Sequence, residues 1–122
     1  MDVLLIEEDL HQSTLIGSML EANEGTRVCV AHSDVDAFKK ITLQGFIPDL
    51  IVCDGVEMLY YLSKAVPNAS YAILSAANDD VLESAVDAAH GCGIEHMNVY
   101  STPLSPSQAE QLINMSVNRV AH

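Results

Sequence analysis

The sequence has few positively charged residues and no long apolar segment. Only five of its 122 residues are lysine or arginine, against 17 aspartates and glutamates, so the formal net charge is −12. A nucleic-acid-binding protein needs a basic patch or stripe, and this chain lacks one, so we expect no direct nucleic-acid partner. No apolar run approaches the length of a membrane span. The first residues contain no basic segment, which argues against a secretory signal peptide.

The chain also lacks a cysteine framework. Its three cysteines are odd in number, and Cys29, Cys53 and Cys92 have no metal-ligand spacing. The five histidines are scattered in the same way. We therefore expect reduced thiols in a cytoplasmic protein, with neither disulfides nor a zinc site.

Apolar runs instead alternate with segments of helical periodicity. The chain is 49% hydrophobic and has no internal repeat or linker, so we expect a single domain, 1–122. The expected strands are 3–6, 27–31, 48–54, 71–74 and 97–100, and the expected helices are 10–21, 34–44, 55–64, 79–90 and 106–120. This alternation predicts an α/β fold, a flavodoxin-like (βα)5 doubly wound parallel sheet of five strands in the order 2-1-3-4-5.

The apolar residues in each expected helix predict its buried side. They are Leu15, Ile16, Met19 and Leu20 in the first helix, Val35, Phe38, Ile41 and Leu43 in the second, Met58, Leu59 and Leu62 in the third, and Leu112, Ile113, Met115 or Ser116, and Val120 in the last. Ser33 is an expected N-cap, and Ser105 with Gln108 predicts a capping box.

Three expected strands end in polar side chains. Glu7 and Glu8 follow the first strand, Asp54 ends the third, and Ser75 follows the fourth. Open α/β sheets bind ligands at the carboxyl ends of their strands, and the first and third strands are neighbours in this order. Carboxylates gathered there repel one another unless a cation such as Mg²⁺ joins them. Asp54 is then a candidate nucleophile toward phosphorus, and the Ser75 hydroxyl a candidate donor to a phosphate oxygen.

Each of these residues also has a plainer interpretation. Asp54 precedes an expected helix and suits an N-cap. Glu7 and Glu8 could be solvated acids before a helix start, and Ser75 could be a loop serine.

The order of these motifs resembles the receiver domain of bacterial two-component response regulators, over nearly the whole chain. Glu7 and Glu8 match the acidic pair, Asp54 the phosphoacceptor, Ser75 the Ser/Thr-Ala pair, and Thr102, which precedes Pro103, the Lys-Pro segment. The resemblance implies a signalling domain that is not itself an enzyme. It also implies Mg²⁺ held by Glu7, Glu8, Asp54 and the backbone carbonyl of Val56.

Several positions depart from the family pattern. The usual lysine is Thr102, which offers a hydroxyl and no charge. The Met-Pro-x-x-Asp-Gly run that usually follows the phosphoacceptor is missing, so Val56 stands in a shortened loop. The aromatic switch position falls on Val99 or Tyr100, depending on register.

The resemblance also implies partners. These are a sensor histidine kinase or phosphotransfer protein, and an output domain in a longer multidomain regulator. The segment 93–112 is most similar to receivers joined to cyclic-di-GMP phosphodiesterase (EAL) domains. A homodimer would use the face formed by 79–90, 97–100 and 106–120.

Three functions remain to be separated. The first is phosphoryl acceptance on Asp54. The second is a degenerate receiver that works as a phosphorylation-independent interaction or dimerisation module, which Thr102 and the shortened loop favour. The third, a haloacid-dehalogenase-type phosphatase, needs a second acid two residues after its nucleophile, where this chain has Val56.

Overall fold

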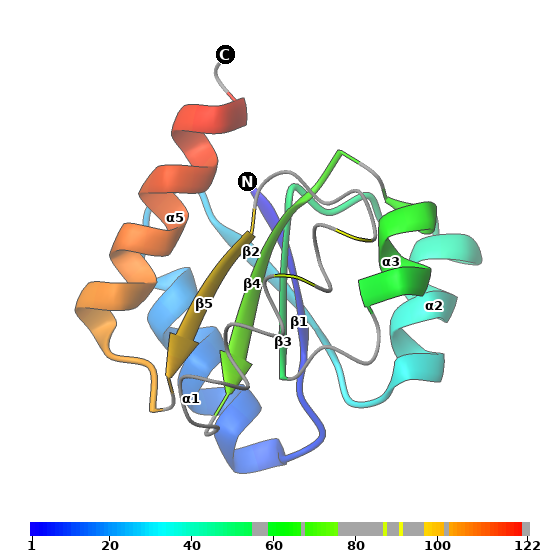
Figure 1. The fold of residues 1–122 in the computed structure, drawn as a ribbon. Helices are drawn as coiled ribbons and strands as arrows, with labels where there is room; N and C mark the ends of the chain where they lie inside the picture. Colours follow the sequence, from blue (N-terminus) through cyan, green and yellow to red (C-terminus); the bar gives the residue numbers. More distant parts are fainter. Residues whose placement is uncertain are drawn as a thin grey trace.

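A five-stranded parallel sheet forms the centre of the protein. The computed structural model describes residues 1–54, 59–66, 68–75, 87, 91, 97–101 and 103–120. The strands are β1 (Asp2–Ile6), β2 (Arg27–Ala31), β3 (Leu50–Asp54), β4 (Ser70–Ser75) and β5 (Met97–Ser101). They lie in the order β2-β1-β3-β4-β5, and all neighbours are parallel (Figure 1). The predicted fold class is confirmed.

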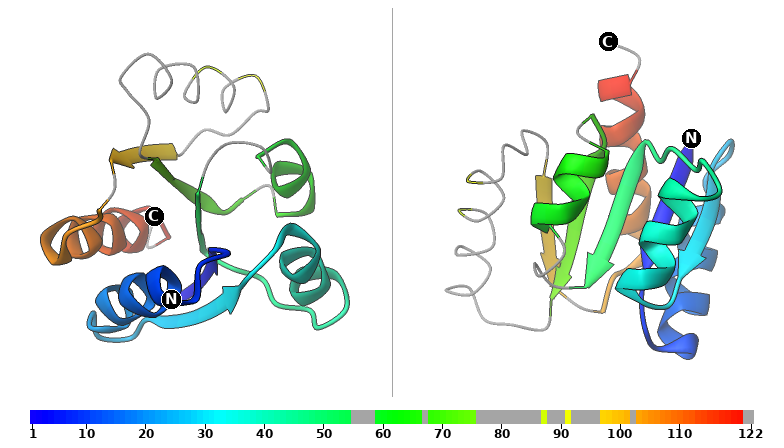
Figure 2. Two further views of the ribbon diagram at one scale, coloured as in Figure 1. Left: turned by 90° about the horizontal axis from the view of Figure 1, so that it is seen from below. Right: turned by 90° about the vertical axis from the view of Figure 1, so that its right-hand side faces the viewer.

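Helices cover both faces of this sheet. Helices α1 (Leu10–Glu21) and α5 (Pro106–Val120) lie on one face, and α2 (Asp34–Thr42) and α3 (Leu59–Ala65) lie on the other (Figure 2). Of the helix expected at 79–90, only Asp87 is among the described residues, and it is helical. The first four residues of the helix expected at 55–64 also lie outside the described part.

The three central strands, β1, β3 and β4, are mostly apolar because both of their sides are buried. On β1, Val3 and Leu5 join the cluster under α1 and α5, whereas Leu4 and Ile6 join the cluster under α2 and α3. Side chains alternate between the faces of a strand, so a doubly covered strand needs apolar residues at every position. This is why the central strands are nearly continuous apolar runs in the sequence.

Helix α1 lies close to the sheet through small residues. Its buried residues are Ser13, Ile16, Gly17 and Leu20. A Cβ atom added at Gly17 would lie 3.9 Å from Leu5 Cδ2. Leu15 is 46% exposed, so its predicted place on the buried side was wrong. Ser13 and Gly17 occupy the face against the strands, and Leu15 lies outside it.

Helix α2 presents a narrower buried side than its sequence suggested. Its one fully buried residue is Ala37, while Phe38 and Ile41 are half-buried against the core. Val35 and Leu43 are exposed, which contradicts the prediction. The helix lies over the β1–β2 edge of the sheet, so only a short stretch of it meets the core.

Local signals at the helix ends are confirmed. Ser33 Oγ accepts a hydrogen bond from the Asp36 N–H at 3.0 Å, as an N-cap does. Ser105 and Gln108 form the predicted capping box: Gln108 Oε1 accepts from the Ser105 N–H at 3.0 Å, and Ser105 Oγ from the Gln108 N–H at 3.1 Å.

The remaining predictions about the core are mostly confirmed. Leu62, Leu112 and Ile113 are buried, whereas Met115 is exposed and Ser116 is buried in its place. The Ser116 hydroxyl donates to the Leu112 carbonyl at 3.0 Å, so the buried oxygen has a partner. Cys29 and Cys53 form no disulfide, and Cys92 lies outside the described residues. In the described part, no helix is long and apolar enough to cross a bilayer.

Candidate functional site

Strand register places Glu7 and Asp54 next to each other at the carboxyl edge of the sheet. Ile6 on β1 pairs with Cys53 on β3. The next residues along the chain are Glu7, which directly follows β1, and Asp54, which ends β3. Neighbouring strands lie about 4.8 Å apart, so the two backbones are close at this level. The acidic pair after β1 therefore stands beside the last residue of β3, as the strand order predicted.

The same register adds Ser75. Asp54 pairs with Leu74 on β4, and Ser75 lies one residue further toward the carboxyl edge, paired with Ser101 on β5. The structure thus brings Glu7, Asp54 and Ser75 to one edge on three adjacent strands. Thr102, which follows Ser101, lies outside the described residues, and so does Val56. Their roles stay predictions.

The three acids after β1 have different surroundings. The Glu7 N–H donates to the Ala31 carbonyl at 2.9 Å, which extends the contact between β1 and β2. Glu7 is half-buried, and its Oε1 accepts from the Asp9 N–H at 3.2 Å. Asp9 caps α1, because its Oδ1 accepts from the Gln12 N–H at 2.9 Å. Glu8 is exposed. Asp9 therefore has a structural role, whereas Glu8 faces solvent.

These residues fit a divalent cation in ligand type. Mg²⁺ binds through one or two carboxylates and keeps several waters, and the ends of β1 and β3 supply carboxylates on adjacent strands. Among the described side chains, no group of three or more His, Cys, Asp or Glu could hold a metal ion. The side chain of Asp54 is not among these described side chains. Glu7 and Glu8 are the described residues that would hold Mg²⁺ together with Asp54.

A polar chain from Glu7 to α2 was not anticipated from the sequence. His32 Nδ1 lies 3.1 Å from the Glu7 carbonyl oxygen, and the His32 N–H donates to Asp36 Oδ2 at 3.2 Å. Asp36 Oδ1 lies 3.4 Å from Lys40 Nζ. The His32 backbone N–H, followed by Lys40, holds the pKa of Asp36 below its ordinary value. The signal available in sequence was Ser33 followed by Asp36, which had indicated only a helix start.

The two candidates for the aromatic switch position lie on opposite faces of β5. Val99 packs against the cluster under α2 and α3, and Tyr100 against the cluster under α1 and α5. Tyr100 pairs with Leu74, one residue before Ser75. Partial burial raises the pKa of the Tyr100 phenol.

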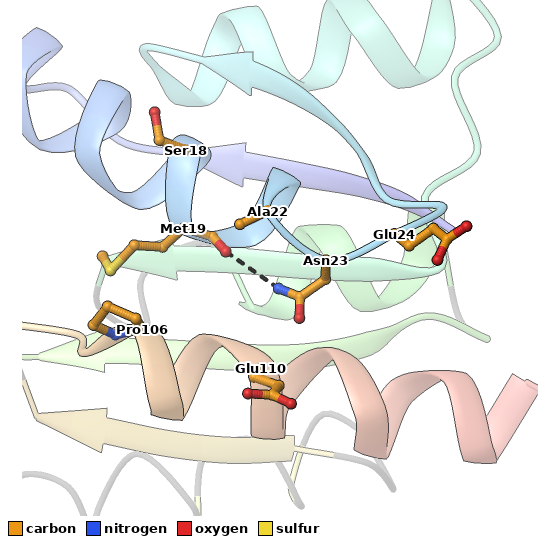
Figure 3. A pocket seen from close by; sticks show the side chains of 7 residues that line it. All are labelled: Ser18, Met19, Ala22, Asn23, Glu24, Pro106 and Glu110. Carbon is orange, nitrogen blue, oxygen red and sulfur yellow. Dashed lines mark hydrogen bonds between the residues drawn. The ribbon is translucent and has the colours of Figure 1, made fainter.

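A hollow lies elsewhere, on the α1–α5 side of the protein. Its volume is about 600 Å³. Figure 3 shows Met19 on α1 facing Pro106 on α5. The Asn23 Nδ2 donates a hydrogen bond to the Met19 carbonyl oxygen at 3.2 Å. The charged residues that line it are Glu24 and Glu110. Two carboxylates without a lysine or arginine repel a phosphoryl group, so this hollow does not suit phosphate chemistry.

Comparison with known proteins supports the fold, but it does not identify the chemistry of the site. No protein-family model and no curated protein matches the sequence. A response regulator receiver domain protein from Clostridium thermocellum matches with a TM-score of 0.80 at 22% identity, covering 98% of this chain and 96% of that one. The receiver domain of Francisella response regulator 1452 matches at 0.76 and 24%, covering 98% of each chain.

A structure described as an adenylate cyclase from Rhodopirellula baltica has the same fold. Its TM-score is 0.78 at 18% identity, covering 97% of this chain and 87% of that one. The chain therefore has the fold of receiver domains, and proteins described in other terms share that fold. Function has to be argued from the site itself.

Proposed function

We propose that this chain is a receiver domain of two-component signal transduction, in which Asp54 accepts a phosphoryl group. One observation carries the proposal: Asp54 is the last residue of β3 and lies level with Glu7, which follows β1, at the carboxyl edge of a sheet in the order β2-β1-β3-β4-β5. This edge is where open α/β sheets hold their ligands.

The reaction would be a phosphoryl transfer to a carboxylate. An oxygen of Asp54 attacks phosphorus in a phosphohistidine or in acetyl phosphate, forming an O–P bond as the bond to the leaving group breaks. The electron pair of that bond stays with the leaving imidazole or acetate, and the imidazole takes its proton from solvent. Bound Mg²⁺ would neutralise charge on the transferred group. Glu7 and Glu8 would hold the ion, and Ser75 would donate to a phosphoryl oxygen.

Thr102 makes this receiver atypical. A lysine there would supply a cation to the acyl phosphate, and threonine supplies only a hydroxyl. The described basic side chains belong to other contacts or other parts of the fold: Arg27 pairs with Asp2, Lys40 with Asp36, and Lys39 and Lys64 lie in the last turns of α2 and α3. We expect a weaker link between the phosphoryl group and the rest of the domain than a lysine would give.

The proposal includes partners and context. A sensor histidine kinase or a phosphotransfer protein would donate the phosphoryl group, and a C-terminal output domain, of EAL type on the sequence resemblance, would be regulated. Residues 1–122 would form one receiver unit of a longer cytoplasmic regulator. The segment 79–90, β5 and α5 would form the regulated face and, in a dimer, the shared one. The chain would act as phosphoacceptor and not as an enzyme.

Intact-mass measurement after incubation with acetyl phosphate and Mg²⁺ tests the proposal. We expect a gain of one phosphoryl group that requires Mg²⁺, disappears in Asp54→Asn and is removed by hydroxylamine, which cleaves acyl phosphates. Asp49→Asn is the matched control, since Asp49 directly precedes β3 and should leave the gain intact. Glu8→Gln should raise the Mg²⁺ concentration required. No gain on the unmodified protein, or a gain that survives Asp54→Asn, would overturn the proposal.

A second candidate is a degenerate receiver that binds partners without phosphorylation. Thr102 and the missing run after Asp54 favour it. In that case Asp54→Asn and acetyl phosphate would leave the oligomeric state and partner affinity unchanged. Sedimentation of the unmodified protein and of Asp54→Asn, with and without acetyl phosphate, separates the two candidates.

A further inference from the structure

A second hollow lies at the opposite, amino-terminal edge of the sheet, between the end of α2 and the end of α3. Its volume is about 330 Å³, and apolar residues form most of its lining: Ile41, Ile47, Pro48, Ala65, Val66 and Ala69. Ligand pockets measure about 300–1,000 Å³, so this groove is at the small end of that range and has room for one or two side chains. The proposed phosphoryl chemistry does not use it.

The loop that forms one wall displays two aliphatic side chains. Leu43 is 78% exposed and Ile47 is 76% exposed. The Leu43 N–H donates to the Lys39 carbonyl at 2.9 Å, and the Phe46 N–H donates to the Lys40 carbonyl at 3.0 Å. Phe46 packs against the core between the two exposed side chains. Leu43 and Ile47 are therefore held outward by an anchored loop, at a cost in exposed apolar surface that a binding site would explain.

The two walls are fixed relative to each other. Phe38 of α2 and Tyr61 of α3 pack edge to face, with ring centroids 6.2 Å apart. The Asp49 N–H donates to the Asp2 carbonyl at 2.8 Å, and Asp49 Oδ2 accepts from the Asp2 N–H at 2.9 Å. The carboxylate in the lining is thus already bonded to the backbone of β1. The groove is preformed, so binding a segment there should cost little conformational entropy in the protein.

Three lysines lie in the helix turns next to this groove, and one of them, Lys40, is paired with Asp36. Lys39 and Lys40 lie in the last turn of α2, and Lys64 in the last turn of α3. These are three of the five basic residues in a chain of net charge −12. Lys40 and Lys64 directly precede the lining residues Ile41 and Ala65. Lysines in the helix turns next to an apolar groove favour a partner with aliphatic side chains flanked by carboxylates.

We propose that this groove docks a short amphipathic segment of a partner protein, with aliphatic side chains in the groove and carboxylates facing the lysines. A second copy of the chain does not suit it, because an isologous contact would bring the same lysines together. Docking here does not require a phosphoryl group on Asp54.

Two labelled peptides test the docking. Both peptides form helices and carry leucines at the same positions, spaced alternately three and four residues apart. One has glutamates beside the leucines, and the other has lysines there. Titration into ¹⁵N-labelled protein should shift the amides of the lining residues Ile41, Ile47 and Ala65 for the glutamate peptide only. Ile47→Ser should weaken its binding about tenfold, since tenfold is the effect of losing one well-buried anchor.

Val35→Ser is the matched control, because Val35 is a β-branched residue on α2 that is 64% exposed and lies outside the groove. It should leave binding unchanged, and Lys64→Glu should weaken the glutamate peptide and strengthen the lysine peptide. Ile47→Ala replaces Ile47→Ser if far-UV circular dichroism shows that the latter is misfolded. The proposal is overturned by equal binding of both peptides, by no binding, by shifts on the α1–α5 side, or by a dimer that Ile47→Ser dissociates.

Discussion

Replacing Gly17 by alanine should stabilise the protein. Gly17 is buried in the middle of α1, and a Cβ atom built there would meet only Leu5 Cδ2, at 3.9 Å. That distance is an ordinary van der Waals contact, so the methyl group fits without moving β1. Alanine is favoured over glycine inside a helix by about 0.8 kcal/mol, and the buried methyl adds a few tenths more. We expect a gain of about 1 kcal/mol.

The same substitution should destabilise the protein at Gly25 and Gly45. Neither added Cβ would touch another atom, but the backbone φ angles are +79° and +70°. A residue with a Cβ pays about 1–2 kcal/mol in this left-handed region, and the smaller entropy of its unfolded chain recovers only part of that. We expect a loss of about 1 kcal/mol at each site. At Gly17 the room available for a methyl group determines the change in stability, whereas at Gly25 and Gly45 the backbone conformation determines it.

Urea unfolding followed by far-UV circular dichroism measures both the expected gain in stability at Gly17 and the expected losses at Gly25 and Gly45. A change of 1 kcal/mol moves the midpoint by about 0.5 M at a slope typical of small domains, and the melting temperature by about 4 °C. The slope should stay constant, since no variant changes the buried area much. A lower midpoint for Gly17→Ala would refute the spacing between α1 and β1. A higher midpoint for Gly25→Ala or Gly45→Ala would refute the conformation of those loops.

Two further predictions concern helix starts. Ser105→Ala should lower the free energy of unfolding by about 1 kcal/mol, and Ser105→Ala with Gln108→Ala should lose less than the sum of the single losses, because both belong to one capping box. Additive losses in urea midpoints would contradict the reciprocal bonds. Asp36 has a folded pKa below its ordinary value of 3.8, so its contribution is complete above pH 3.8 and disappears as the pH falls through the lower folded value. The stability difference between the unmodified protein and Asp36→Asn should therefore be full at pH 7 and shrink in acid, and a difference that grows in acid would contradict the assignment.

The sheet could be predicted from the sequence because each doubly covered strand leaves an unbroken apolar run. The helix faces were harder. Ser13 and Gly17 of α1 are buried because they are small enough to let the helix approach β1. The pattern of large apolar residues in the sequence instead predicted burial of Leu15, which is exposed. Close approach depends on the partner surface, which the helix sequence alone does not contain.

The carboxyl edge was predictable for a different reason. Strand order and strand ends are topological, so the positions of Glu7 and Asp54 followed from the pattern alone. The contact between His32 and the Glu7 carbonyl was not predictable, because it joins residues 25 positions apart through a histidine with no recognisable spacing. Periodicity reports which face a residue occupies, and it carries no information about which polar atom across a loop it will meet.

The polar chain that begins at Glu7 bears on how a site without a lysine could act at a distance. It passes through His32 and Asp36 to Lys40, and Lys40 directly precedes Ile41 in the lining of the groove. One hydrogen-bonded path that leaves Glu7 thus runs through His32 and Asp36 toward α2. This chain of contacts couples the phosphoryl site to the groove only if α2 has two arrangements and phosphorylation of Asp54 favours one of them. The decisive quantity is the affinity of the glutamate peptide with and without acetyl phosphate. A change that Asp54→Asn abolishes and His32→Ala reduces would make α2 the output element, whereas a constant affinity would leave the groove and the phosphoryl site as independent features of one fold.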